Sequence, residues 1–256
     1  MRIAVCLKQV VTRESPVRLD RAGSWIDEAQ AGWELNEPDA YALEAALRIR
    51  EQHGGDVVAV SAGPARVTQI LREALARGAD RAVHVGGDHL ASADAGTTAA
   101  ALAAALEPEA ADLVLTGLQS DDQGAGQVGV MLAEILGRPH ASIVMAIEVA
   151  GATLRVKREL EAGWSQWVAL PMPAVLTIQS GINQLRYATL KGIMGAKKKE
   201  IRSVAAPAAV PGGEARQRIV RLVAPERGRK TELVGGPPAE AARTLVGLLR
   251  DRARVI

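Results

Sequence analysis

The clearest capacity for chemistry lies in residues 117–129, where a short apolar run leads into a polar loop rich in glycine. A helix is predicted to follow, and the free N–H groups at a helix start favour a phosphate or pyrophosphate. Asp121 and Asp122 could accept hydrogen bonds from ribose hydroxyls, and Gln119 and Gln127 supply amide donors and acceptors. The segment therefore indicates a nucleotide site, although a solvated turn would have the same composition.

The same loop formally matches G-x-G-x-x-G at Gly124, Gly126 and Gly129, with Glu148 at about the distance of a ribose-binding acid. In dinucleotide-binding domains the glycines follow the first strand closely. Here six residues separate Gly117 from Gly124, and the loop belongs to the fourth strand–helix unit. The match is therefore weak evidence for a conventional NAD-binding fold.

Two further loops contain residues that suit a ligand crevice. Residues 36–39 (Asn-Glu-Pro-Asp) open a predicted helix, with Asn36 as its N-cap and acids in the first turn. Small residues at 61–64, including Ala62, would let a ligand approach the backbone closely. Helix capping alone explains the first pattern adequately, and a plain turn explains the second equally well.

A third cluster lies at residues 181–199, where Leu190, Ile193 and Met194 stand beside a run of lysines. An apolar tip with basic neighbours is typical of a partner-binding anchor, although a core helix with solvated lysines has the same composition. The chain has no Ser–His–Asp triad signature and no Walker sequence, and its four histidines lack ligand spacing. We therefore expect no catalytic residue and no metal site.

The first half of the chain alternates apolar runs with helical patterns, which is typical of βαβ units. Strands are predicted at residues 3–7, 56–61, 81–85, 112–116 and 141–149. Helices are predicted at residues 39–50, 66–77, 94–106 and 125–136. The pattern predicts an α/β fold, a Rossmann-like nucleotide-binding fold with a doubly wound, mostly parallel sheet.

The second half predicts a small antiparallel meander, in which Pro171 and Pro173 limit one strand to an edge or a turn. Its strands are expected at residues 154–160, 164–170 and 174–179. Residues 203–236 are rich in Pro, Gly, Arg and Ala, and residues 238–252 form one amphipathic helical pattern. Residues 1–200 contain 20 basic and 24 acidic residues, whereas residues 201–256 contain 11 and 5. We expect a nucleotide-binding domain at 1–200 and an extended, basic C-terminal arm at 201–256, which is either solvated or lies on a partner's surface.

Composition excludes several classes of protein. The 256 residues are 48% hydrophobic and 23% charged, as in a globular chain, and charged residues interrupt every apolar run that could enter a membrane. Aromatic residues make up 2%, which disfavours stacking on nucleic acid. The start of the chain does not resemble a signal peptide, and the single cysteine, Cys6, cannot form an internal disulfide. We therefore expect a cytoplasmic protein with no nucleic-acid partner and no membrane insertion.

Several of these segments together resemble the beta subunit of electron transfer flavoprotein. The similar strings are Val-Cys-Leu-Lys-Gln-Val at 5–10, residues 36–48, Val-Ser-Ala-Gly-Pro at 60–64, Gly-Ala-Asp-Arg at 78–81, residues 117–129 and Arg-Tyr-Ala-Thr-Leu-Lys-Gly-Ile-Met-Gly-Ala-Lys-Lys-Lys at 186–199. The resemblance implies pairing with an alpha subunit that holds a redox FAD. It also implies that this chain binds an adenine nucleotide at the sheet edge, wraps its arm around the partner and performs no acid–base catalysis.

Matching positions imply contacts to the nucleotide from several loops. These residues are Cys6, Asn36, Glu37, Pro38, Asp39, Ala62, Gly117, Leu118, Gln119, Ser120, Asp121, Asp122, Gln123, Gly124, Ala125, Gly126, Gln127 and Val128. Leu190 takes the place of the hydrophobic anchor that docks dehydrogenases, with Ile193 and Met194 beside it.

Two departures from the family pattern bear on function. The usual Asn-Glu-Pro-Arg-Tyr reads Asn-Gln-Leu-Arg-Tyr at 183–187, and the polar loop at 119–127 is similar to the Fix-type branch. That branch implies a second FAD in place of AMP and electron bifurcation from NADH, with a quinone oxidoreductase or ferredoxin as acceptor. Two other readings stay open, a stand-alone adenine-nucleotide-binding module of the universal-stress type and an NAD-dependent dehydrogenase.

Overall fold

The computed structural model describes residues 1–206, 215–224 and 231–256. The chain forms two units, Met1–Arg221 and Leu222–Ile256. Parts of the predicted C-terminal arm, residues 207–214 and 225–230, lie outside the described residues. In the second unit, α6 (Pro238–Gly247) continues into a π-helical turn, Leu248–Ala253, so the predicted helix at 238–252 is present there in two segments.

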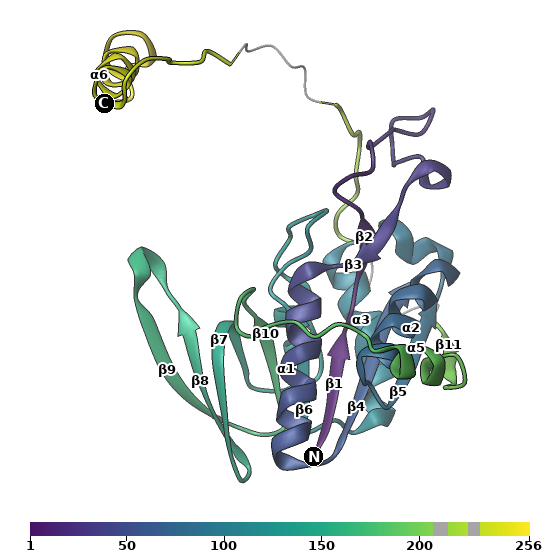
Figure 1. The fold of residues 1–256 in the computed structure, drawn as a ribbon. Coiled ribbons are helices and arrows are strands. Elements are labelled where there is room, and N and C mark those ends of the chain that lie inside the picture. Colours follow the sequence, from purple (N-terminus) through teal and green to yellow (C-terminus); the bar gives the residue numbers. More distant parts are fainter. Residues whose placement is uncertain (207–214, 225–230) are drawn as a thin grey trace. The chain divides into compact units, whose positions relative to one another are not determined.

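Within the described residues, nine strands form one sheet in the order β11-β5-β4-β1-β6-β10-β7-β8-β9 (Figure 1). Their bounds are β1 Arg2–Cys6, β4 Asp56–Gly63, β5 Arg81–Gly86, β6 Leu113–Gly117, β7 His140–Ala150, β8 Thr153–Glu159, β9 Ser165–Pro171, β10 Ala174–Ile178 and β11 Ile201–Ala205. Neighbouring strands are parallel from β11 to β7, and β8 and β9 continue the sheet in antiparallel fashion. The predicted α/β class, with a mostly parallel sheet and an antiparallel extension, is confirmed.

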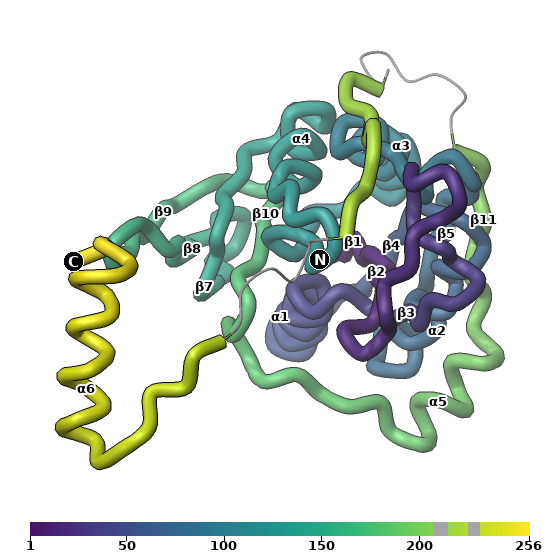
Figure 2. The backbone as a smooth tube through the Cα atoms, turned by 90° about the horizontal axis from the view of Figure 1, so that it is seen from above, coloured from purple at the N-terminus to yellow at the C-terminus, as the bar shows by residue number. Residues whose placement is uncertain are grey.

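Helices cover both faces of the parallel strands (Figure 2). The helices of the first unit are α1 Glu37–His53, α2 Thr68–Arg77, α3 Ala95–Leu106, α4 Val128–Ile135 and α5 Leu190–Ala196. In β1, Ile3 and Val5 pack on the side of α1 and α2, while Ala4 and Cys6 pack on the side of α3 and α4. This period-two alternation follows from strand geometry, and it places an apolar layer on each face.

Four details differ from the predicted elements. Residues 174–178 form β10, which lies between β6 and β7 in the parallel part of the sheet and does not continue the meander. Helix α4 begins at Val128 because Gly124 and Gly126 have φ values of 61° and 64°, which an α-helix excludes. The hairpin of β2 (Gln9–Val11) and β3 (Trp33–Leu35), and the edge strand β11, were not predicted.

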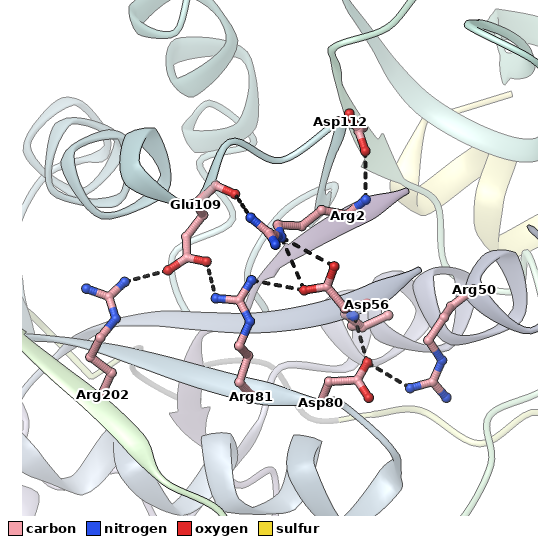
Figure 3. Close-up of polar contacts among 9 residues, drawn as sticks. Arg2, Arg50, Asp56, Asp80, Arg81, Glu109, Asp112 and Arg202 are labelled. Atoms are coloured by element: carbon pink, nitrogen blue, oxygen red, sulfur yellow. Dashed lines mark hydrogen bonds and ion pairs between the residues drawn. The ribbon is translucent and has the colours of Figure 1, made fainter. Parts of the chain in front are cut away.

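An ion-pair network connects the amino-terminal ends of the parallel strands β1, β4, β5 and β11 (Figure 3). Arg2 Nε and Arg81 Nη2 both reach Asp56 Oδ2, at 3.2 and 2.9 Å, and hold the pKa of that carboxyl below its usual range although partial burial raises it. Arg81 and Arg202 share the carboxylate of Glu109, Arg202 at 2.5 Å. Because Arg202 belongs to β11, the network fixes the edge strand to the centre of the sheet.

No helix among the described residues is long and apolar enough to cross a membrane.

Candidate functional site

The strand order reverses between β4–β1 and β1–β6, and a cleft opens at the carboxyl ends of these strands. Open α/β sheets bind ligands at such a switch point. The cleft measures about 840 Å³, including space open to solvent, and is lined by the ends of β1 and β6, the start of α1, the glycine-rich loop and residues 90–102. The structure thus brings the glycine-rich loop against the start of α1, which lies about eighty residues earlier in the chain.

Asp39 braces the floor of the cleft. Its buried carboxylate accepts the backbone N–H of Lys8, at 2.7 Å, and the backbone N–H of Gly117, at 2.8 Å, so it joins the tips of β1 and β6. Burial raises the pKa of Asp39 to about 6, against the lowering effect of these two hydrogen bonds. A Cβ atom at Gly117 would lie 2.4 Å from Asp39 Oδ1, so only glycine permits this close approach.

Asn36 occupies the predicted N-cap position of α1, but its side chain makes no capping hydrogen bond. Its amide group instead bridges to the glycine-rich loop, donating from Nδ2 to the carbonyl of Gln119 and accepting at Oδ1 from the N–H of Asp121, both at 3.0 Å. The side chain thus pairs with the loop backbone as another peptide group would. This bridge fixes the loop to the start of α1.

Two cations also contact the loop. The ammonium of Lys8 lies 2.7 Å from Asp122 Oδ1, 3.2 Å from Ser120 Oγ and 3.3 Å from Gln123 Oε1. Burial raises the pKa of Asp122, but Lys8 and hydrogen bonds outweigh it and hold that pKa below its usual range. Exposed Arg13 spans Glu37 and Asp121, at 2.9 and 3.4 Å. The loop is therefore held from β1, from α1 and from the segment after β2.

The start of α4 completes the cleft. The side chain of Gln127, the N-cap residue, makes no capping bond, and the first N–H groups of a helix have no acceptor within it. A Cβ atom at Gly129 would lie 2.5 Å from Thr177 Cγ2 and 2.6 Å from Thr116 Oγ1, so this glycine lets α4 pack closely on β6 and β10. Small residues and unpaired donors thus meet where an anionic ligand would be favoured.

Most of the predicted contact residues line the cleft. These are Cys6, Asn36, Asp39, Ala62, Gly117, Leu118, Gln119, Ser120, Gln123, Ala125, Gly126, Gln127 and Val128. Glu37, Pro38, Asp121, Asp122 and Gly124 belong to the same loops but are not among the lining residues. Glu148 lies on β7, where it pairs with Arg155 at 3.0 Å, and is also not among them. Burial raises the pKa of the Cys6 thiol, which is consequently neutral.

The sequence prediction missed one wall of the cleft. Leu90, Ala91, Ala93, Ala95, Thr98 and Leu102 line it from the turn Asp88–Ser92 and from α3. The turn follows the carboxyl end of β5, so the rule that ligands lie beyond these strand ends could have identified it. Lys8 was missed for a different reason, because a lysine at a strand end reads as a solvated side chain.

The predicted anchor residues lie on α5 (Figure 1), and none of them is among the residues that line the cleft. Leu190, Ile193 and Met194 are 77%, 43% and 57% exposed. A Cβ atom at Gly192 would lie 2.3 Å from the carbonyl of Ala76, so α5 packs directly on α2. The three apolar side chains therefore project from a closely seated helix.

The segment before α5 is tied to α1. Arg186 donates to Glu44 from Nε at 2.7 Å and to Glu51 from Nη1 at 2.5 Å. Arg72 donates to the carbonyls of Ala196 and Lys199 beyond the anchor, both at 2.5 Å. The exposed apolar side chains are thus presented from a segment held on both sides.

Comparison with known proteins bears on this site. A family model described as the electron transfer flavoprotein domain matches residues 24–209. The beta subunit of electron transfer flavoprotein from Methylophilus methylotrophus is 38% identical over 255 residues, which cover 96% of this chain and 97% of that protein. This chain belongs to that family.

Other members agree along their full length. The beta subunit of electron transfer flavoprotein from Bacillus subtilis is 32% identical over 260 residues, covering all of both chains. The one from Syntrophomonas wolfei is 33% identical over 256 residues, covering 100% of this chain and 98% of that protein. The predicted resemblance to this flavoprotein family is confirmed, and the chain is the beta-type subunit.

Proposed function

We propose that this chain is the nucleotide-holding subunit of a heterodimeric electron carrier. Family membership implies a partner alpha subunit, which would hold the redox FAD. Electrons would arrive from dehydrogenases and leave to a quinone- or ferredoxin-linked acceptor by docking. The chain itself would position a nucleotide, because small residues, backbone donors and an ammonium group line its cleft.

The observation that carries the proposal is the convergence of uncapped α4, the glycine-rich loop and the Asp39 brace on one cleft. The residues present suit an adenosine 5′-phosphate, since they combine backbone donors, one ammonium group and small side chains. Loop residues 118–127, with Cys6, Asn36 and Ala62, would hold it. When bound, a flavin there would supply electron-transfer chemistry, and an AMP would serve a structural role.

AMP and FAD share this adenosine phosphate portion. The loop at 119–127 favours a second FAD, and with it electron bifurcation from NADH, while AMP is the other candidate. The decisive experiment is to purify the complex with its alpha subunit, denature it and count released FAD and AMP per heterodimer. Two FAD support the second flavin, whereas one FAD and one AMP refute it. A complex with no adenine compound beyond the alpha-subunit FAD refutes the nucleotide function.

A loop variant tests the location. Gly126→Leu should lower the nucleotide content at this site at least about tenfold, because the new side chain enters the cleft lining. Gly137→Leu is the matched control, since Gly137 has a similar φ of 60°, has nothing near its Cβ position and lies beyond α4. Full nucleotide content in Gly126→Leu would contradict the assignment.

Each of the two alternative functions has its own test. A stand-alone nucleotide-binding module would be stable and monodisperse without an alpha subunit. An NAD-dependent dehydrogenase would show substrate-dependent hydride transfer by the isolated chain. A cytoplasmic location and docking of dehydrogenases through Leu190 stay predictions.

A further inference from the structure

The cleft contains a cation, Lys8, that is not among the predicted nucleotide contacts. Lys8 is the only Lys, Arg or His among the lining residues that the structure describes. Acidic groups lie close to it, with Asp39 in the floor and Asp122 paired to the ammonium. Without Lys8, the ionisable groups around the cleft would repel a phosphate.

The backbone of Lys8 is fixed while its side chain is held only by loop side chains. Its N–H donates to Asp39 at 2.7 Å, and its carbonyl accepts the N–H of Asn36 at 3.0 Å. Its ammonium contacts Ser120, Asp122 and Gln123, all through their side chains, and the Lys8 side chain is 38% exposed. An ammonium is a point charge on a flexible stem, so it can exchange one oxygen partner for another without moving the backbone.

We propose that Lys8 selects phosphorylated nucleosides for this cleft, by giving its ammonium group to phosphate oxygens in exchange for the carboxylate of Asp122. The inference rests on the proposed nucleotide function and deepens it. It holds for AMP and for FAD alike, because both contain an adenosine 5′-phosphate. Lys8 is then a binding residue, and its ammonium group leaves Asp122 when the phosphate binds.

The charge of Lys8 should distinguish AMP from adenosine. Backbone N–H groups of the loop and of α4 can donate to a hydroxyl oxygen or to a phosphate oxygen, so they contribute to the binding of adenosine as well as of AMP. The start of α4 offers a phosphate only partial positive charges, whereas the ammonium of Lys8 offers a full one, and charge-assisted hydrogen bonds are about twice as strong as neutral ones. Lys8 should therefore govern the ratio of the two affinities and leave adenosine binding nearly unchanged.

The test uses the full chain in complex with its alpha subunit, after the nucleotide of this site has been removed by dialysis. Titration calorimetry measures the Kd of AMP and of adenosine for the wild type, Lys8→Met and Lys8→Arg. We expect Lys8→Met to weaken AMP about tenfold or more and adenosine less than about twofold. Lys8→Arg should keep AMP within about threefold, because it keeps the charge.

Arg13→Met is the matched control. Arg13 is also a cation that pairs with the loop, through Asp121, but it is not part of the cleft lining. We expect its ratio of AMP to adenosine affinity to equal that of the wild type. Raising NaCl from about 50 to 500 mM should weaken AMP binding in the wild type more than in Lys8→Met.

The outcomes distinguish a failure of the role of Lys8 from a failure of the proposed nucleotide function. Equal loss of AMP and adenosine affinity in Lys8→Met would show that Lys8 only holds the loop, and unchanged AMP affinity would show that it does not meet the phosphate. Either result overturns this inference and leaves the proposed function standing. A wild-type complex that binds neither AMP nor adenosine refutes the proposed function itself.

Discussion

Replacing Gly117 with alanine should disrupt the floor of the cleft. The new Cβ atom would lie 2.4 Å from Asp39 Oδ1 and 2.8 Å from both the Asp39 nitrogen and the Pro38 carbonyl carbon. Ordinary contact begins at 3.4 Å, so the start of α1 must retreat by 0.6 to 1.0 Å. That movement breaks the hydrogen bond from the Gly117 N–H to Asp39.

The magnitude follows from two effects. Overpacking against backbone costs about 1–3 kcal/mol, and loss of a hydrogen bond to a charged acceptor costs about 1.5–3 kcal/mol. The free energy of unfolding should therefore fall by about 2.5–6 kcal/mol. Nucleotide content should fall with it, because the displaced atoms line the cleft.

Gly86→Ala is the control. Gly86 also ends a parallel strand, β5, at the same edge of the sheet, and its nearest atom to a new Cβ is His84 Cε1 at 3.4 Å. We expect a change within about 0.5 kcal/mol. Chemical denaturation of each complex, followed by circular dichroism, measures both variants. If Gly117→Ala unfolds within 1 kcal/mol of Gly86→Ala, the close approach is not the reason for this glycine.

Three further predictions concern charge and the exposed anchor. Burial raises the pKa of Asp39 from 3.8 to about 6, so its contribution to stability is present below pH 4 and is lost as the pH rises through 6. Urea unfolding at pH 4.5 and 7.5 should show that the difference in unfolding free energy between the wild type and Asp39→Asn declines by about 2 kcal/mol, and a constant difference would contradict this. Arg186→Lys removes the forked contacts of the guanidinium to buried Glu44 and should lower the free energy of unfolding by about 2 kcal/mol, with faster amide hydrogen exchange at 183–199. As the control, Arg155→Lys at the exposed pair with Glu148 should lower it by less than about 0.5 kcal/mol. Leu190→Ala should leave stability and flavin content unchanged but slow electron transfer from a partner dehydrogenase about tenfold; an unchanged rate removes the anchor assignment.

The parallel core of the fold was predictable because its signals are local. Residues 3–7, 56–61, 81–85 and 112–116 are short apolar runs between helical patterns, and all four form parallel strands within a residue or two of the predicted bounds. The pairing of residues 174–178 was not predictable in this way. A strand of five buried residues is consistent with any central position, and only the packing of the whole sheet places it beside β6.

The cleft could be located from its glycine-rich loop, but its internal contacts could not. Asn36 has the residue type and position of an N-cap, yet its amide group forms hydrogen bonds with the loop at 119–121 instead of with the first turn of α1. That competition depends on two segments more than eighty residues apart in the chain. The sequence thus predicted several of the loops that meet at the cleft, but neither the turn after β5 nor the pairs of atoms that join the loops.

The segment between β10 and β11 has a mechanical consequence. It leaves the sheet next to β6, crosses the faces of α1 and α2, and rejoins the sheet at its far edge (Figures 1 and 2). Each end is a hydrogen-bonded strand, and Arg186 and Arg72 fasten the middle. A segment held at four points can move little. A partner that binds the apolar side chains of α5 would therefore find them already ordered, and their binding would cost little conformational entropy.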